Sequence, residues 1–418
     1  MEILNEADRV DRAVSIIITL QVTLLGAKNV LVQGFPFFYS INTKLNIVIL
    51  SFVSLLYLYA YFRLFKRNLY SGAVFYYAFI FISIVFSFLI FPQNIPYILE
   101  ISLRWVVVLF ATGYLVAKLK SLVWLQKYML YSSYILSISC VFFAVIVSMV
   151  GQIASNETSP YSLTMSYVGM WAVMWQLHAF FKQSNKLALL FAVLTSFIIV
   201  LYGSRNPLIA IVIYIIIMLF DMAKNQKSKE VRLLSYILIM LFCLFGLFWK
   251  RILGFVFSLF ESFGLSSRTI NMFLEAAEGD GDFSSGRNDI HDELIKLIFD
   301  HPIFGMGICG DSANMNETAH SLYLSIYATY GIIIGTFFLL FIIQQCLSAF
   351  KKAKGLDHQV LLLFFCMVFP RGFTGGDIWE SDVFWFMMGL VFMILNKKTG
   401  KNAKISNYSK EDSVYSVS

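Results

Sequence analysis

Long apolar runs separated by short polar stretches make up most of this 418-residue chain. A helix needs about 20 mostly apolar residues to cross the hydrocarbon core of a bilayer. We identify twelve candidate membrane-spanning helices: 13–33, 45–62, 72–91, 97–117, 128–150, 161–181, 187–203, 207–222, 233–249, 320–345, 359–373 and 379–395. The strands of a membrane barrel would alternate apolar and polar residues, and runs such as 211–220 do not. The pattern therefore predicts an all-α polytopic membrane protein.

The composition excludes several other classes of protein. Hydrophobic residues make up 59% of the chain and charged residues 14%, whereas a soluble domain carries roughly 25% charged residues. Disorder requires low hydrophobicity, and five cysteines are too sparse for a disulfide scaffold. The net charge of +7 does not identify a partner. We expect the many aromatic side chains to face lipid or pack the core, so binding of nucleic acid is not predicted.

The distribution of basic residues predicts the orientation in the membrane. If the N-terminus is cytoplasmic, 22 of the 32 lysines and arginines fall in cytoplasmic segments and nine on the opposite side, while Arg104 lies inside the fourth span. Both termini are therefore expected in the cytoplasm. The first apolar run is not followed by a small-residue cleavage site, so we expect it to be an anchor instead of a removable signal peptide.

One long connection interrupts the succession of spans. The chain divides into spans one to nine (1–249), a long extracytoplasmic loop (250–319), spans ten to twelve (320–395) and a polar, cytoplasmic tail expected to be disordered (396–418). Within the loop, the spacing of apolar residues predicts amphipathic helices over 267–277 and 288–300. Long loops in compact proteins are usually functional, so we expect the chemistry to lie here.

Three polar residues gather on the predicted extracytoplasmic face. Arg205 lies in the tight connection 202–207, Arg287 follows Ser284-Ser285-Gly286, and His320 begins the tenth span. Arginine offers a planar set of donors suited to phosphate oxygens, and histidine transfers protons near neutral pH. The three residues together could bind a lipid-linked phosphate and deprotonate an acceptor hydroxyl. In the alternative interpretations, Arg205 anchors a helix end at the headgroups, Arg287 caps or pairs within its loop, and His320 is a solvated residue at a helix start.

Further charged residues lie near the same face. Glu100 and Arg104 are four residues apart in the fourth span, and intramembrane ion pairs are costly and tend to mark functional cavities. The alternative is a structural pair that locks two helices. Arg371 lies near three acids around the last extracytoplasmic turn, and this group either completes a cavity or forms a solvated rim: Asp377, Glu380 and Asp382. The remaining histidines are expected to be structural or surface residues: His178, His291, His301 and His358.

The chain contains no complete sequence motif for binding a metal ion or a nucleotide. The segment 280–291 begins like a calcium loop, but its sixth and twelfth positions are Ser285 and His291. A Walker A sequence is missing, and Gly305-Met306-Gly307 lacks the third glycine of a dinucleotide-binding motif. The sequence therefore predicts no metal and no cofactor.

Taken in order, these segments resemble the O-antigen polymerase and ligase superfamily, which comprises Wzy-type polymerases and WaaL-type ligases. The resemblance covers about residues 200–335 and lies in the segments 204–210 (SRNPLIA), 285–287 (SGR), 301–307 (HPIFGMG), 320–324 (HSLYL) and 330–335 (YGIIIG). One departure is Ser321, because an asparagine often follows the histidine in this superfamily. The other parts of the chain match in hydropathy only.

The resemblance implies a GT-C-like fold in the bacterial inner membrane, with a site that faces the periplasm. It also implies metal-independent, inverting glycosyl transfer without a cofactor. The donor would be an oligosaccharide linked to undecaprenyl pyrophosphate, held by Arg205 and Arg287, which would stabilise the charge that develops on the leaving group. His320 would position or deprotonate the acceptor hydroxyl. Further substrate-binding candidates near this site are Glu100, Arg104, Tyr323 and Arg371.

The nature of the acceptor separates the remaining alternatives. A polymerase uses a second lipid-linked repeat unit, and a chain-length-determining co-polymerase is a compatible partner. A ligase uses a sugar of the lipid A core. Lysines outnumber arginines 21 to 11, as expected of AT-rich DNA such as O-antigen gene clusters often have, and this favours the polymerase. A flippase for the same lipid-linked sugars is the rival from another class, but transporters commonly show internal repeats and midplane charges, which the sequence lacks.

Overall fold

The computed structural model describes residues 6–34, 40–154, 162–225, 229–262, 270, 272–275 and 287–397. The described residues are mostly helical and contain no β-strand. Seven of their helices are long and apolar enough to cross a membrane, and three shorter apolar helices accompany them. The predicted class, an all-α polytopic membrane protein, is thereby confirmed.

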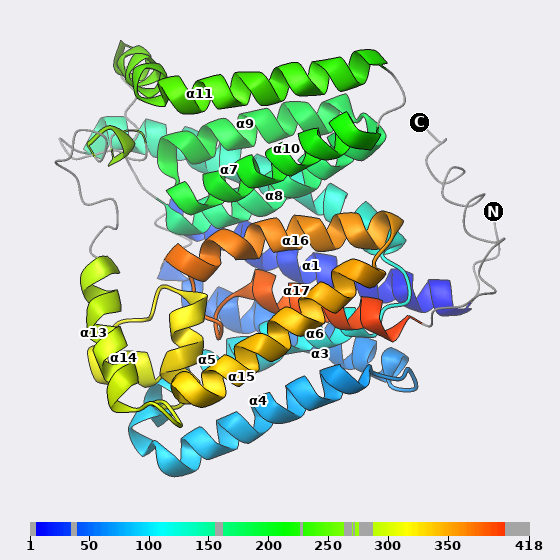
Figure 1. Ribbon diagram of the computed structural model, residues 1–418, viewed down its shortest axis with the longest axis vertical. Helices are drawn as coiled ribbons and strands as arrows, with labels where there is room; N and C mark the ends of the chain where they lie inside the picture. The colour runs from blue at the N-terminus through cyan, green and yellow to red at the C-terminus, as the bar shows by residue number, and fades with distance from the viewer. Residues whose placement is uncertain are drawn as a thin grey trace.

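The helices are labelled as in Figure 1. The bounds are α1 (Glu6–Gly34), α3 (Asn42–Leu64), α4 (Ser71–Ile90), η1 (Pro92–Asn94), α5 (Ile95–Arg104), η2 (Trp105–Phe110), α6 (Ala111–Ala117), α7 (Val123–Ala154), α8 (Leu163–Gln183), α9 (Lys186–Tyr202), α10 (Arg205–Asn225), α11 (Lys229–Ser262), α13 (Arg287–Asp300), α14 (Gly310–Met315), α15 (Leu322–Lys352), α16 (Gly355–Thr374) and α17 (Asp382–Asn396).

The twelve predicted spans correspond to helices of the structure, although not all of these helices qualify by length and hydropathy. The fourth span is a broken helix, in which the π-helix η2 joins α5 to α6. The helices α9 and α17 have 17 and 15 residues. The helix α8 carries polar side chains that are satisfied inside the bundle: His178 lies 3.0 Å from the Gln126 amide nitrogen and 3.1 Å from the Tyr214 hydroxyl. The number twelve stays a prediction.

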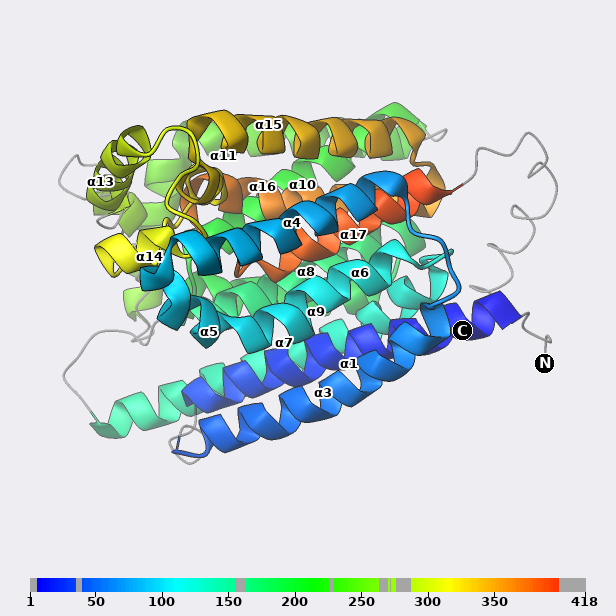
Figure 2. The same cartoon turned by 90° about the horizontal axis from the view of Figure 1, so that it is seen from below.

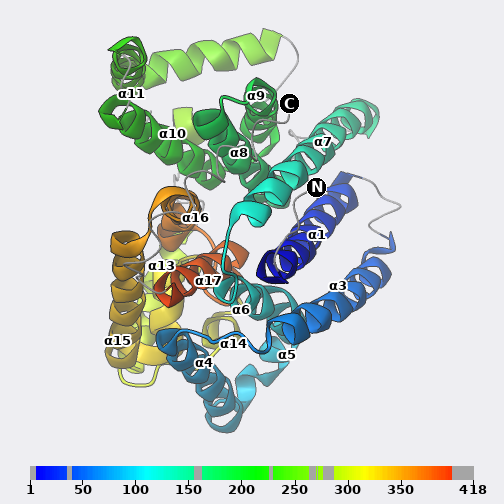
Figure 3. The same cartoon turned by 90° about the vertical axis from the view of Figure 1, so that its right-hand side faces the viewer.

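The helix α17 lies at the centre of the bundle (Figure 3). All twelve residues from Val383 to Ile394 are buried, as expected of a helix that is apolar on every side. The approach of α6 explains one glycine of α17: a Cβ on Gly389 would lie 2.5 Å from the carbonyl oxygen of Gly113. The ring of Phe386 stacks on Phe364 of α16 with centroids 4.3 Å apart.

Most helices run lengthwise between two ends of the bundle (Figure 2). One end, which we term the α1 end, contains the start of α1 and the end of α17. The α3–α4 and α15–α16 connections also lie there. The helices α13 and α14 lie at the opposite, α13 end. The connections assigned to the cytoplasm thus share one end, while the side of a membrane that each end faces stays a prediction.

The expected long loop begins within a helix. The α11 helix continues past residue 249 to Ser262, while the end of the ninth span at residue 249 stays a prediction. The helix expected over 288–300 is confirmed as α13, with Leu294 and Ile298 buried. Of the helix expected over 267–277, residues 272–275 are helical. The other positions lie outside the described residues apart from residue 270, as does the tail from residue 398.

Candidate functional site

The connection between α16 and α17 is the centre of a polar site at the α13 end. Arg371 lies in the last turn of α16, where a cation is favoured by the helix dipole. The guanidinium carbon lies 3.9 Å from the centroid of the Tyr167 ring, a cation–π contact. One guanidinium nitrogen lies 3.2 Å from a carboxylate oxygen of Asp382 and 3.4 Å from the Ser381 hydroxyl. Arg371 is thus fixed between α8 and the start of α17.

The segment that carries His320 is attached to the end of α16. Ser321 is the N-cap of α15, and its hydroxyl accepts a hydrogen bond from Leu324 N (3.4 Å) and donates one to Gly372 O (2.8 Å). The Tyr323 ring packs against Gly372, where a Cβ would lie 2.7 Å from it. The serine that departs from the family pattern therefore has a structural role, since it joins the start of α15 to the residue after Arg371.

His320 lies just before the helix it was expected to begin, in the left-handed region with a φ of 46°. The preceding amide, Ala319 N, donates to a carboxylate oxygen of Asp311 at 2.8 Å, which holds the segment against α14. The imidazole Nδ1 lies 3.4 Å from the Thr318 hydroxyl and Nε2 lies 4.0 Å from Glu317. The ring is 37% exposed and so remains accessible to a substrate.

The first two turns of α13 add Arg287 and His291 near His320. Burial lowers the pKa of His320, and the charge of Arg287 lowers it further, while Glu317 opposes the shift. The neutral imidazole is therefore favoured, the form needed in a general base. His291 follows Arg287 by one turn of α13, and burial lowers its pKa. From the sequence we expect His291 to be a structural or surface residue, and its spacing of four from Arg287 is the signal that places both side chains on one face of α13.

Arg205 begins α10 beside the same site. Asn206 is buried, and a Cβ on Gly375 would lie 2.7 Å from its amide nitrogen and 2.8 Å from the Tyr167 hydroxyl. Ser204 N donates to the Ser166 hydroxyl of α8 at 2.8 Å. The start of α10 and the tyrosine on which Arg371 rests therefore both lie against Gly375. The order of the chain does not reveal this contact, because Asn206 and Gly375 lie far apart in sequence.

A cavity of about 590 Å³ opens next to this polar group. Arg371, Asp382, Glu380 and Glu100 line it on the side of α16, α17 and α5. The π-helix η2 also contributes lining residues, and such segments occur frequently at functional sites. The side chain of Arg104 lies outside the described part of the structure, so the expected pair with Glu100 is untested. The cavity lining does not include four of the residues expected at the site: Arg205, Arg287, His320 and Tyr323.

Two buried carboxyl groups lie beneath the site. Asp377 is 6% exposed; it accepts hydrogen bonds from the Ser325 hydroxyl and, at 2.9 Å, from Trp379 N. Burial raises the pKa of Asp377, and the carboxyl of Asp311 raises it further. The four residues expected around the last turn therefore divide: Arg371, Glu380 and Asp382 line the cavity, whereas Asp377 is part of the interior.

Glu380 lines the cavity, and its charge also acts on His320, whose pKa it raises slightly. The structure thus gathers the starts of α10, α13 and α15 and the end of α16 at one end of the bundle. In the described ranges, no cluster of three or more His, Cys, Asp or Glu side chains could hold a metal ion. Arginines, a half-buried histidine and a cavity are suited to binding an anionic substrate and moving a proton.

The comparison with protein families agrees with the predicted resemblance. Residues 190–340 match the family described as O-antigen ligase. The matched segment contains Arg205, Arg287 and His320, whereas Glu100 and Arg371 lie outside it. The match supports a glycosyltransferase-like enzyme of the polymerase or ligase class. No curated protein matches the chain.

Proposed function

Since the match over residues 190–340 supports the O-antigen polymerase and ligase superfamily, we propose that this protein is an O-antigen polymerase. It joins oligosaccharide repeat units carried on undecaprenyl pyrophosphate, by inverting, metal-independent glycosyl transfer, in lipopolysaccharide biosynthesis. The protein spans the bacterial inner membrane with both termini in the cytoplasm and the α13 end in the periplasm.

The observation that carries the proposal is the convergence at the α13 end. Four segments that are distant in sequence meet there, because Ser321 bonds to Gly372 and Asn206 lies against Gly375. Arg287 acts electrostatically on His320 from α13. Two cations and a proton acceptor beside a cavity fit a lipid-linked pyrophosphate donor and a sugar hydroxyl acceptor.

The proposed reaction assigns one role to each group. Arg205 and Arg287 bind the pyrophosphate of the donor and stabilise the negative charge that grows as the glycosidic C–O bond breaks. The acceptor hydroxyl attacks the anomeric carbon from the face opposite the pyrophosphate, which inverts the configuration. The hydroxyl proton passes to His320, whose lowered pKa keeps the imidazole neutral. Arg371 and Glu100 line the cavity that receives the glycan, and Tyr323 holds the start of α15 against Gly372.

Deletion of the gene and electrophoresis of lipopolysaccharide test this function. Loss of a polymerase leaves a single repeat unit on the core, loss of a ligase leaves bare core, and loss of a flippase depletes lipid-linked units from the periplasmic leaflet. We expect the single repeat unit.

The same assay tests the residues. Arg205→Ala, Arg287→Ala and His320→Ala should each reproduce the deletion at unchanged protein level. Arg251→Ala and His358→Ala are matched controls, because both side chains are exposed and neither lines the cavity, and they should keep the full ladder. Full ladders from all three site variants would overturn the assignment.

A further inference from the structure

The cavity has a second polar wall, formed by α1 and α3. Lys28 of α1 is 8% exposed, and its ammonium donates hydrogen bonds to the side-chain oxygens of Asn46 (2.6 Å) and Asn42 (3.1 Å). All three side chains line the cavity. The helices α1 and α3 lie on a different side of the central α17 from α16 and α15 (Figure 3). The Lys28 wall is therefore separate from the residues around Arg371.

The two walls differ in charge. Among the lining residues that α1 and α3 contribute, Lys28 is the one charged side chain, and Gln21 and Asn29 add neutral amides. The wall near α16 and α17 carries Arg371 together with the acids Glu100, Glu380 and Asp382. An ammonium inside a membrane protein is costly and tends to mark a substrate pathway. Lys28 is therefore the group of this wall that can attract a negative charge, whereas the three acids of the opposite wall would repel one.

The rest of the lining suits a carbohydrate. Two lining residues, Gln21 and Thr112, contact the hydroxyl of Tyr57 at 2.9 Å and 2.7 Å. Tyr167 and Trp171 supply aromatic surface, and amide side chains can both donate to and accept from sugar hydroxyls. A volume of about 590 Å³ lies within the range of small-molecule sites.

We propose that Lys28, positioned by Asn42 and Asn46, binds an anionic group of the glycan substrate, either the carboxylate of an acidic sugar or a phosphate. The inference rests on the proposed function, because it assigns the cavity to the same lipid-linked glycan. It adds a binding residue outside the matched segment 190–340.

Equilibrium binding to the purified, full-length protein in detergent tests the inference. The probes are undecaprenyl pyrophosphate for the phosphate and glucuronic acid for the carboxylate, with glucose as the neutral counterpart. Lys28→Met should weaken binding of one anionic probe about tenfold or more, because a hydrogen bond to a charged group is lost. Lys28→Arg should retain most of the affinity, and glucose binding should not change. Lys44→Met is the matched control, since Lys44 is exposed in the first turn of α3.

The two probes identify the source of the charge. If Lys28→Met weakens the binding of undecaprenyl pyrophosphate alone, Lys28 binds a phosphate. If it weakens the binding of glucuronic acid alone, Lys28 binds the carboxylate of an acidic sugar. The inference would be refuted if Lys28→Met bound both anions with the affinity of the unaltered protein. It would also be refuted if Lys44→Met lost as much affinity as Lys28→Met. The proposed function fails separately, if Arg205→Ala and His320→Ala keep the ladder of lipopolysaccharide.

Discussion

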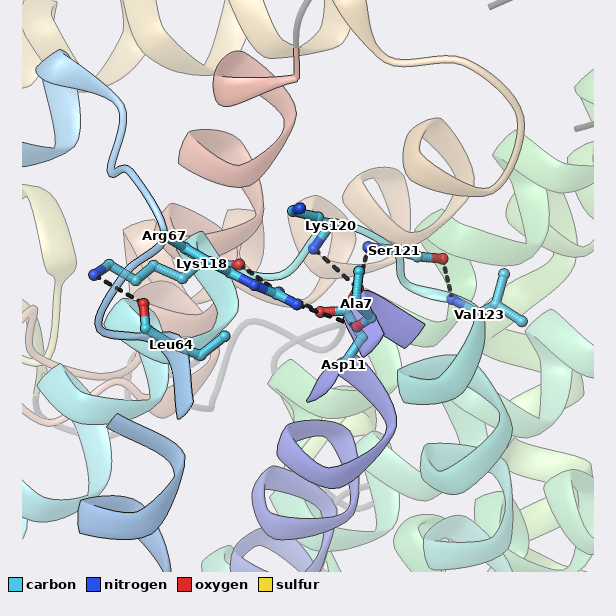
Figure 4. Close-up of polar contacts among 8 residues, drawn as sticks. All are labelled: Ala7, Asp11, Leu64, Arg67, Lys118, Lys120, Ser121 and Val123. Carbon is cyan, nitrogen blue, oxygen red and sulfur yellow. Dashed lines mark hydrogen bonds and ion pairs between the residues drawn. The ribbon is translucent and has the colours of Figure 1, made fainter. Parts of the chain in front are cut away.

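Two buried aspartates at opposite ends of the molecule have different surroundings. Asp11 at the α1 end is 1% exposed and forms an ion pair with Arg67. Its other oxygen accepts hydrogen bonds from the backbone amides of Lys120 (3.2 Å) and Ser121 (3.0 Å) (Figure 4). Asp377 at the α13 end is also buried, but the groups around it are the Ser325 hydroxyl, the backbone amide of Trp379 and another carboxyl group, that of Asp311.

The ion pair at the α1 end is structural, whereas other charged residues at the α13 end can serve a reaction. The guanidinium of Arg67 also donates to the carbonyl oxygens of Lys118 (3.0 Å) and Ala7 (3.1 Å), so the Asp11–Arg67 pair joins α1 to the segments that follow α3 and α6. At the α13 end, Arg371 and Glu380 face a cavity instead. Charges satisfied by backbone groups hold elements together, whereas charges that line a cavity are available to a substrate.

The largest expected effect comes from breaking the pair at the α1 end. Asp11→Asn leaves the charge of Arg67 in a largely buried position, and removing one partner of a buried pair costs about 3–5 kcal/mol. We expect a lower unfolding temperature of the detergent-solubilised protein, followed by circular dichroism, together with reduced protein in the membrane.

A double variant sharpens this prediction. Asp11→Leu combined with Arg67→Met removes both charges, and replacement of a buried ion pair by apolar residues is often neutral. The double variant should therefore unfold above the temperature of Asp11→Asn. An unfolding temperature of Asp11→Asn equal to that of the unaltered protein would contradict a structural role for this pair.

The sequence predicted the membrane fold well, because apolar runs determine which segments leave water. It also identified the segments of Arg205, Arg287 and His320 through the family pattern. It did not predict that Asp11 pairs with Arg67, because hydropathy carries no information on contacts between helices.

The geometry of the site was equally beyond the sequence. The contacts of Ser321 with Gly372 and of Gly375 with Asn206 join segments about 50 and 170 residues apart, and periodicity does not encode such pairings. The cavity wall of Lys28, Asn42 and Asn46 was missed for the same reason.

An intermediate effect is expected at Asp377, where it depends on pH. The pKa of Asp377 is raised by burial and by Asp311, so the folded protein retains a proton that the unfolded chain has released. Stability then falls as the pH rises from the unfolded pKa near 3.8 to the folded pKa. Asp377→Asn keeps an acceptor oxygen for Ser325 and Trp379 but does not ionise. The variant should lose less stability with rising pH, by about 1.4 kcal/mol for each unit by which the folded pKa is raised.

Unfolding temperatures between pH 5 and pH 8 measure this effect. Asp300→Asn is the control, because Asp300 is exposed at the end of α13, and its pH profile should match that of the unaltered protein. A profile of Asp377→Asn as steep as that of the unaltered protein would show that Asp377 is ionised in the folded state, and the contrast with Asp11 would be lost.

The smallest expected effect is at the ion pair between Lys182 of α8 and Asp221 of α10. The two charged atoms lie 2.9 Å apart, as in a strong pair, but the side chains are 23% and 40% exposed. Exposed pairs contribute about 0.2–1 kcal/mol because water screens them. Asp221→Ala should therefore lower the unfolding temperature far less than Asp11→Asn, and the loss should shrink in high salt. A loss as large as that of Asp11→Asn would mean that charge pairing, and not burial with backbone partners, determines which ion pairs hold this bundle together.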